Sequence, residues 1–195
     1  MPNILRLLLF LVFGKWQKAR CLWYFQFSAR KRRLNKIFQE TLPAYARRGT
    51  PAATLERYTV KFRRHFGTGH RPFFGRLYWD ASFGIALSID ERVIAIIGFS
   101  PIEDAVIIPQ IQGVRGNERE LSHTLRWERL LIDLLTRVTR NSGAYKEIRM
   151  ISATQSFWYQ YGDLGKRMAR RYDGTAFDMG FWWHPAGYYV RELDG

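Results

Sequence analysis

The fold is decided by residues 83–113, FGIALSIDERVIAIIGFSPIEDAVIIPQIQG. This stretch contains three runs rich in β-branched residues, each typical of a buried β-strand: 83–89, 93–99 and 105–111. The first two runs are separated by a connection short enough for an antiparallel hairpin. We therefore expect a sheet whose first strands are antiparallel.

A helical period follows this stretch. Apolar residues recur at intervals of three and four from Glu118 to Val138. A strand is then expected over 147–152, a helix over 162–172 and a last strand over 187–193. This order predicts an α+β fold with a mixed, largely antiparallel sheet flanked by helices.

Charge is distributed unevenly along the 195 residues, whose formal net charge is +14. Residues 1–66 hold fifteen basic and two acidic residues, whereas 67–195 hold sixteen basic and fifteen acidic residues. We therefore predict a cationic, aromatic, helical N-terminal arm over 1–66 and a globular domain over 67–195. Within the arm, helices are expected over 34–45 and 53–66.

The beginning of the arm has the composition of a membrane-surface helix. Residues 4–13 are apolar, and aromatic rings follow before a basic run. This order is typical of a helix that lies on anionic lipid. Alternatively, the apolar stripe packs against the domain, or the rings and cations bind single-stranded nucleic acid, which is the least favoured alternative. The predicted membrane-binding residues are Trp16, Trp23, Arg30, Lys31, Arg32 and Arg33.

Cysteine usage and hydropathy predict the compartment. Cys21 is the single cysteine, which excludes an intramolecular disulfide. The apolar run 4–13 has about half of the roughly 20 residues that a spanning helix needs. We expect a cytoplasmic protein, peripheral at the inner leaflet. The histidines lack paired ligand spacing, so no metal site is expected.

The loop after the third strand is the first candidate ligand site. A strand, a glycine-containing loop and a helix in succession can hold an anion at the helix N-terminus. Alternatively, the loop is a simple turn in which Asn117 caps the helix and Glu120 completes a capping box. The candidate ligand-binding residues are Gln112, Gly113, Val114, Arg115, Gly116 and Asn117.

Four side chains are candidates for proton transfer. His123 lies on the predicted helix with Glu118 and is a candidate general base. Tyr172 is a candidate acid, and Asp173 is the carboxylate that would orient it. The alternatives are a surface histidine and a turn that Asp173 anchors before a glycine.

The order of elements and the motif Gln110-Ile111-Gln112-Gly113-Val114-Arg115 resemble the GCN5-related N-acetyltransferase (GNAT) family. That family's loop reads Gln/Arg-x-x-Gly-x-Gly/Ala, and Arg115 departs from its last position. Ala176 stands where the family often has a tyrosine acid, four residues before Gly180. The resemblance implies GNAT-like architecture and an acyl-CoA whose pyrophosphate lies at the loop. It also leaves the role of acid to Tyr172, one turn earlier.

A second resemblance rests on short motifs spread over roughly 55–193. The chain resembles the VirK/YbjX family of bacterial proteins, which is associated with virulence and with envelope or antimicrobial-peptide resistance and has no established reaction. The motifs are Gly98-Phe99-Ser100, Ile111-Gln112-Gly113, Thr124-Leu125-Arg126 and Arg171-Tyr172-Asp173.

Together these observations give one leading hypothesis. It is a membrane-associated, acyltransferase-like bacterial protein that moves an acyl group from acyl-CoA or acyl carrier protein to an amine or hydroxyl. Its expected partners are an anionic membrane surface or an acidic acyl carrier protein. The alternative, favoured by Arg115 and Ala176, is a non-enzymatic envelope or virulence accessory factor of VirK type. Nucleic-acid binding through the arm is less favoured.

Overall fold

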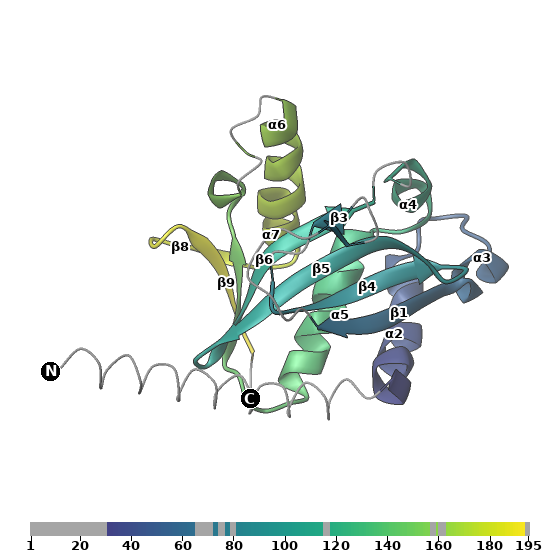
Figure 1. Ribbon diagram of the computed structural model, residues 1–195, viewed down its shortest axis with the longest axis horizontal. Coiled ribbons are helices and arrows are strands. Elements are labelled where there is room, and N and C mark those ends of the chain that lie inside the picture. Colours follow the sequence, from purple (N-terminus) through teal and green to yellow (C-terminus); the bar gives the residue numbers. More distant parts are fainter. Residues whose placement is uncertain are drawn as a thin grey trace, which may run out of the picture.

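A computed structural model describes residues 31–64, 72–73, 77–78, 81–114, 118–156, 159 and 163–193. Its main element is a seven-stranded sheet with the order β1-β4-β5-β6-β7-β9-β8, and β2 and β3 form a separate pair (Figure 1). The strands are β1 (Tyr58–Arg64), β2 (Pro72–Phe73), β3 (Leu77–Tyr78), β4 (Phe83–Ile89), β5 (Arg92–Ile102), β6 (Ala105–Gly113), β7 (Glu147–Ile151), β8 (Trp182–His184) and β9 (Tyr188–Glu192).

Neighbouring strands of the large sheet are antiparallel, except for β6 and β7, which are parallel. The parallel pair requires a crossover connection, and the helices after β6 supply it. The predicted α+β class, with a mixed and largely antiparallel sheet, is therefore confirmed.

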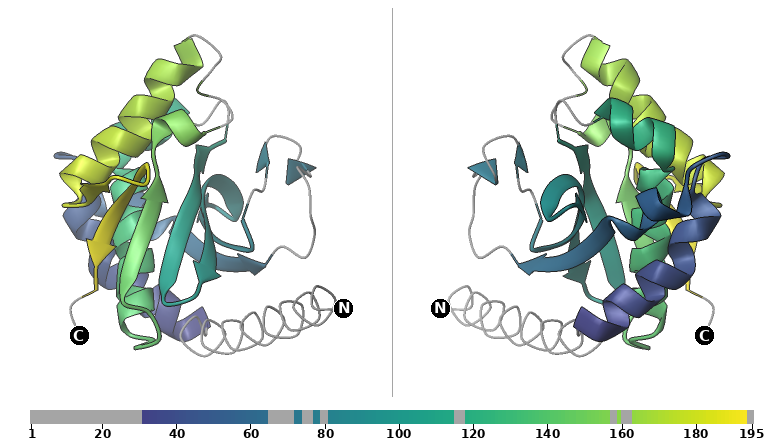
Figure 2. Two further views of the ribbon diagram at one scale, coloured as in Figure 1. Left: turned by 90° about the vertical axis from the view of Figure 1, so that its left-hand side faces the viewer. Right: turned by 90° about the vertical axis from the view of Figure 1, so that its right-hand side faces the viewer.

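Helices cover one side of the sheet. Figure 2 shows α2, α5 and the run from α6 to α7 on this side, with the β2–β3 pair on the other. The helices are α2 (Lys31–Tyr45), α3 (Ala52–Glu56), α4 (Glu118–Thr124), α5 (Trp127–Arg140), α6 (Asp163–Ala169) and α7 (Thr175–Asp178). A 3₁₀ turn (Ala153–Gln155) follows β7, and a π-helical turn (Arg170–Gly174) joins α6 to α7.

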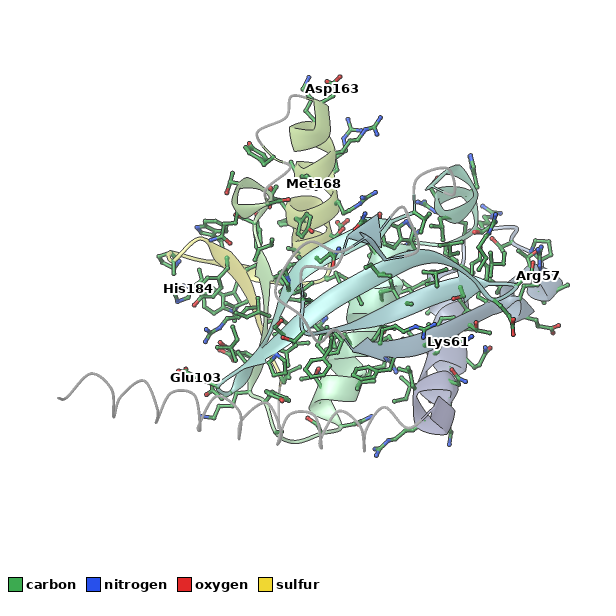
Figure 3. All side chains as sticks on the ribbon, in the orientation of Figure 1. Arg57, Lys61, Glu103, Asp163, Met168 and His184 are labelled. Atoms are coloured by element: carbon green, nitrogen blue, oxygen red, sulfur yellow. The ribbon has the colours of Figure 1, made fainter. Side chains whose placement is uncertain are left out.

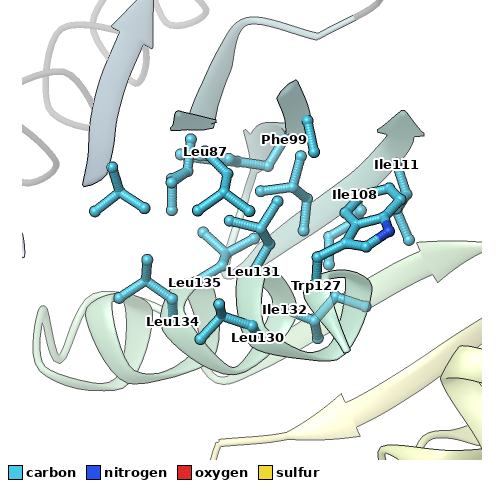
Figure 4. Packing of buried hydrophobic residues seen from close by; sticks show 14 of the residues in the cluster. Leu87, Phe99, Ile108, Ile111, Trp127, Leu130, Leu131, Ile132, Leu134 and Leu135 are labelled. Carbon is cyan, nitrogen blue, oxygen red and sulfur yellow. The ribbon is translucent and has the colours of Figure 1, made fainter. Parts of the chain in front are cut away.

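The core lies between α5 and the sheet. Leu131 and Leu135 of α5 are fully buried and face Phe99 of β5, as Figure 4 shows. Phe99 also packs against Phe62 and Phe83, with ring centroids 6.2 and 5.8 Å away. The apolar face predicted for this helix is therefore the face that the core buries.

The three strands predicted over 83–111 are confirmed, and the pattern placed their N-terminal ends within one residue. Asp90 and Glu91 form the predicted hairpin turn and have positive φ angles of 47° and 66°. The strands predicted at 147–152 and 187–193 are β7 and β9.

The helix predicted over 53–66 is wrong. Only α3 is helical there, and the chain continues as β1, which pairs with β4 along its full length. Tyr58 and Val60 are buried while Thr59 between them is exposed. Alternation with a period of two is the pattern of an edge strand with one buried face.

The helix predicted from Glu118 to Val138 is interrupted. It consists of α4 and α5, separated by Leu125 and Arg126. The Arg126 N–H donates to the Tyr45 carbonyl and the Arg47 N–H donates to the Thr124 carbonyl, both at 2.9 Å. These bonds tie the break to the segment after α2, so a tertiary contact outweighs the helical period.

Residues 31–64 belong to the same core as the rest of the described chain. Phe38, Leu34 and Leu42 of α2 are buried in it, as is Val60 of β1. Within the described residues, the core therefore does not begin at residue 67. The predicted membrane-binding residues Trp16, Trp23 and Arg30 lie outside the described residues, as does Cys21. Of the basic run, α2 begins with Lys31 and Arg32, and Arg33 is exposed.

Candidate functional site

The candidate site lies where β6 and β7 stop pairing. Among the described residues, their parallel register runs from Ala105 with Glu147 to Ile108 with Met150 and ends there. Strand β6 continues to Gly113 and remains paired with β5 on its other side. On the side of β7, the backbone groups in the second half of β6 therefore have no partner strand among the described residues.

A β-bulge marks the same point of β6. The register with β5 shifts between the pairs Gly98–Gln110 and Ser100–Ile107, so β6 has one residue more than β5 there. Bulges re-aim backbone and side chains and are over-represented next to active sites. Pro109 lies in this segment and has no N–H to contribute to a ladder.

The Tyr172 hydroxyl is inserted at this bulge. The Ile111 N–H donates to the hydroxyl oxygen at 3.0 Å, and the hydroxyl donates to the Pro109 carbonyl at 3.3 Å. The Tyr172 side chain is 4% exposed. One phenol thus satisfies two of the β6 backbone groups beyond the last pair with β7, as buried backbone groups require.

A π-helical turn directs Tyr172 toward β6. The turn runs from Arg170 to Gly174 between α6 and α7. Such turns are rare and occur frequently at functional sites. The sequence predicted Tyr172 as a proton donor, and the structure places its hydroxyl on the backbone of the predicted ligand strand.

Asp173 points to different partners from Tyr172. Its carboxylate accepts a hydrogen bond from the Ala153 N–H at 2.9 Å, at the start of the 3₁₀ turn. Burial raises the pKa of Tyr189, and the charge and hydrogen bond of Asp173 raise it further. Asp173 therefore holds together the end of β7 and strand β9.

His123 and Glu118 lie on α4. His123 is exposed in the last turn of this helix, and the side chain of Glu118 is outside the described residues. The structure therefore places one predicted catalytic residue, Tyr172, in a buried position on β6 and another, His123, in solvent.

The predicted ligand loop is described only at its beginning. Gln112 is half-buried and accepts a hydrogen bond from the Gln110 amide at 2.9 Å. Gly113 pairs with Ala95, and the Val114 N–H donates to the Ile94 carbonyl at 2.8 Å. Arg115, Gly116 and Asn117 lie outside the described residues.

Gln110 is a site residue that the sequence analysis did not single out as such. It is 4% exposed and lies across from Gly98 on β5. A Cβ atom at Gly98 would come within 2.8 Å of the Gln110 amide oxygen and 2.9 Å of the Ala81 Cβ. The glycine therefore makes room for a buried amide beside the bulge, and the Gly98-Phe99-Ser100 motif was the available signal.

A second charged contact lies on the helix side, between the π-helical turn and α5. The Arg171 guanidinium lies 5.3 Å from the Trp127 ring centroid and 3.7 Å from a Glu128 carboxylate oxygen. Burial raises the pKa of Glu128, while the charges of Arg171 and Arg47 act in the opposite direction. These two contacts hold the side chain of Arg171, the residue next to Tyr172, against α5.

The described residues contain neither a cluster of metal ligands nor a membrane-spanning helix. No group of three or more His, Cys, Asp or Glu side chains within that part of the chain could hold a metal ion. None of the helices described is both long enough and apolar enough to cross a membrane.

Comparison with known proteins yields no family model and no curated protein that matches the chain. Part of the chain is similar to a solved GNAT family N-acetyltransferase, YhbS from Escherichia coli in complex with CoA, with 16% identity over 58% of this chain and a TM-score of 0.34. Ard1 from Thermoplasma volcanium is 11% identical over 57% of this chain and 71% of its own, with a TM-score of 0.36.

The matched segment spans 60% of the YhbS chain. At these TM-scores neither similarity carries a conclusion about this chain. The resemblance to VirK/YbjX proteins stays a prediction.

Proposed function

We propose that this protein transfers an acyl group from an acyl thioester, bound along the second half of β6, to an amine or hydroxyl. One observation carries the proposal: the pairing of β6 with β7 ends at Ile108, and the buried Tyr172 hydroxyl contacts the β6 backbone just beyond. Backbone donors and acceptors inside a sheet, next to a proton donor, are what an acyl transfer site needs.

The open side of β6 suits an extended ligand that contains amides. Such a chain can add to a strand edge through main-chain hydrogen bonds. The arm of CoA and of acyl carrier protein carries amides next to its thiol and therefore fits this edge. Because the Pro109 carbonyl and the Ile111 N–H already bond to Tyr172, a ligand must share or replace these bonds.

The bound thioester supplies an activated acyl carbon and a thiolate leaving group. As the acceptor nitrogen or oxygen forms its bond to that carbon, the carbon–sulfur bond breaks. Tyr172 then donates its hydroxyl proton to the thiolate, and the proton lost by the acceptor restores the phenol through solvent. The Ile111 N–H, released from Tyr172, is positioned to donate to the carbonyl oxygen of the acyl group.

The test uses the full chain, because α2 and β1 belong to its core. Calorimetric titration with acetyl-CoA, a long-chain acyl-CoA and an acyl carrier protein thioester measures binding, and release of free thiol measures transfer. We expect Tyr172→Phe to retain binding and to lower transfer about 100-fold. Tyr188→Phe, at a half-buried tyrosine on β9, is the matched control and leaves both unchanged.

Two results would contradict the proposal. One is a folded protein that binds none of the three donors. The other is transfer that Tyr172→Phe and Tyr188→Phe affect equally, because the phenol at the bulge would then have no chemical role.

A non-enzymatic accessory function is the second candidate. The observation in its favour is that Tyr172 satisfies both backbone groups of the bulge and thereby closes the gap between β6 and β7. In that case neither the parent nor Tyr172→Phe binds a thioester, and the substitution only lowers stability. A thermal denaturation series with and without donor separates the two candidates, since only a bound donor raises the midpoint.

We further propose that the basic run binds an anionic membrane surface. Each Lys or Arg near such a surface gains about 1 kcal/mol, so four residues change partitioning by on the order of 10³. Replacing Arg30, Lys31, Arg32 and Arg33 with Gln should therefore lower the partition coefficient on anionic vesicles at low salt by on the order of 10³. Unchanged co-sedimentation would contradict it.

A further inference from the structure

The end of the sheet at β8 exposes large aromatic side chains. Trp182 and Trp183 are 47% and 51% exposed, and Phe177 of the adjacent α7 is 81% exposed. Isolated exposed apolar residues are ordinary, but three large exposed rings within seven residues of sequence call for an explanation. We call Phe177, Trp182, Trp183, His184 and Tyr188 the aromatic edge.

The rings occupy both faces of the sheet. Trp182 pairs with Val190, whereas Trp183 pairs with Tyr189, so the two indoles point to opposite faces. On one face the rings of Trp182, His184 and Tyr188 follow one another at 5.7 and 4.6 Å. On the other, Trp183 packs edge-on against Tyr189 at 5.1 Å.

Each face also carries an arginine. Arg149 pairs with Val190 and lies on the face of Trp182, with its guanidinium 5.3 Å from the centre of the Tyr188 ring. Arg191 lies two residues from Tyr189 and therefore on the face of Trp183. Both arginines are half-buried, and Arg149 also forms an ion pair with Glu147.

We propose that the aromatic edge inserts into the headgroup region of an anionic phospholipid surface. A flat ligand would cover one face of the edge, and a partner strand has only three residues of β8 to pair with. A headgroup layer surrounds an edge and covers both faces. Tryptophan, tyrosine and arginine are the side chains that settle at this depth, with apolar bodies buried and polar tips in water.

This contact uses other residues than the basic run 30–33 and the acyl transfer site at β6 and Tyr172. Figure 3 shows His184 at one extreme of the molecule, opposite Arg57 and Lys61. The contribution of the aromatic edge is largely apolar, so it persists at high salt, whereas binding through a basic run is screened. Salt therefore separates the two contacts in the intact protein.

The first test places a reporter beside the aromatic edge. Ala186, exposed in the β8–β9 turn, is changed to Cys in a Cys21→Ser background and labelled with a polarity-sensitive fluorophore. With vesicles of phosphatidylcholine and phosphatidylglycerol at about 0.5 M NaCl, where screening is nearly complete beyond about 5 Å, we expect a blue shift of emission. The control label at Glu56→Cys, exposed on α3 across the molecule, should not shift.

Three outcomes would overturn the proposal. The first is an unshifted label at residue 186 while the protein co-sediments with the vesicles. The second is an equal shift at residues 186 and 56. The third is an equal shift at low salt with phosphatidylcholine alone, which would remove the preference for anionic lipid.

The second test measures the energetic role of the rings. In the full chain at the same salt, Trp182→Ser combined with Trp183→Ser should lower the vesicle partition coefficient about tenfold or more. Tyr159→Ser, at a ring 41% exposed that is not part of the aromatic edge, should leave it unchanged. Because Trp183 contacts Tyr189, the tryptophan variant also removes a contact within the protein. Phe177→Ser is therefore a second variant: it removes a ring from the outer surface and should lower partitioning in the same direction. Unchanged partitioning in both tryptophan and phenylalanine variants would overturn the proposal.

Discussion

The two halves of the large sheet differ in length and in burial. Strands β1, β4, β5 and β6 have 7 to 11 residues, and every residue of β4 is buried. Strands β7, β9 and β8 have 5, 5 and 3 residues, and their outer end exposes two tryptophans. The first half supplies most of the core, the candidate acyl site lies on β6 at the boundary between the halves, and the aromatic edge lies in the second half.

The boundary between the halves runs along β6. Its first half is hydrogen-bonded to strands on both sides, and its second half is bonded to β5 on one side and to the Tyr172 hydroxyl on the other. A side chain can leave a strand edge, whereas a neighbouring strand in the middle of a sheet cannot do so without disrupting the fold. The proposed binding site therefore lies where a side chain, rather than a strand, completes the hydrogen bonds of β6.

The largest expected effect is on the core of the first half. Phe99→Ala removes a fully buried ring that packs against Phe62 and Phe83, and should lower the free energy of unfolding by about 3 to 5 kcal/mol. Phe177→Ala, at an exposed ring near the second half, should change it by less than about 0.5 kcal/mol. Urea unfolding of both variants measures the contrast, and equal costs would break the comparison.

Filling the space beside the bulge should cost less. In Gly98→Ala, the new methyl group meets the Ala81 Cβ at 2.9 Å and the Gln110 Cβ at 3.0 Å, neither of which can rotate away. We expect a loss of about 1 to 3 kcal/mol in the same urea experiment. The control Gly174→Ala, in the π-helical turn with its nearest neighbour at 3.9 Å, should be neutral or slightly stabilising. A neutral Gly98→Ala would mean that the bulge is loosely packed.

Tyr172→Phe tests whether the Tyr172 hydroxyl completes the hydrogen bonds of β6 at the boundary. Removing the hydroxyl leaves the buried Ile111 N–H and Pro109 carbonyl without that partner, which should cost about 1 to 3 kcal/mol. Amide hydrogen exchange at Ile111 should become faster, while exchange at Ile97 in the middle of β5 should change only as far as global stability does. Unchanged exchange at Ile111 would show that another group replaces the phenol.

The strands at the centre of the sheet could be predicted from the sequence because β-branched runs bounded by turns are a local signal. The β1 strand was missed although Tyr58, Val60 and Phe62 alternate with polar residues, since the preceding helical segment was extended through it. The break at Leu125 and Arg126 depends on contacts with the segment after α2, which no local pattern contains.

The candidate site was predictable in part for the same reason. Gln112 and Gly113 stood out because a glycine follows a β-rich run, and Tyr172 stood out through family resemblance. The bulge at Pro109 and the bond from Ile111 to Tyr172 join residues about sixty positions apart. Backbone groups carry no sequence signal, so only the fold could identify them.

The smallest expected effect is a difference in pH dependence between the two sides of the molecule. Burial raises the pKa of Glu128 beside the π-helical turn, so the folded state holds its proton more tightly than the unfolded chain does. Its contribution to stability is present below the unfolded pKa and is lost as the pH rises through the folded pKa. Asp90 in the β4–β5 turn has the opposite sign, because the hydrogen bond from Arg57 lowers its pKa. Its contribution is present above the unfolded pKa and is lost as the pH falls through the folded pKa.

The measurement is the unfolding midpoint of each variant from acidic to neutral pH. Glu128→Gln should become more stable than the parent as the pH rises. The difference in the free energy of unfolding should stay below about 1 kcal/mol, because Arg171 offsets the burial. The control Asp90→Asn should become less stable relative to the parent over the same range, and parallel profiles for the two variants would contradict the raised pKa of Glu128.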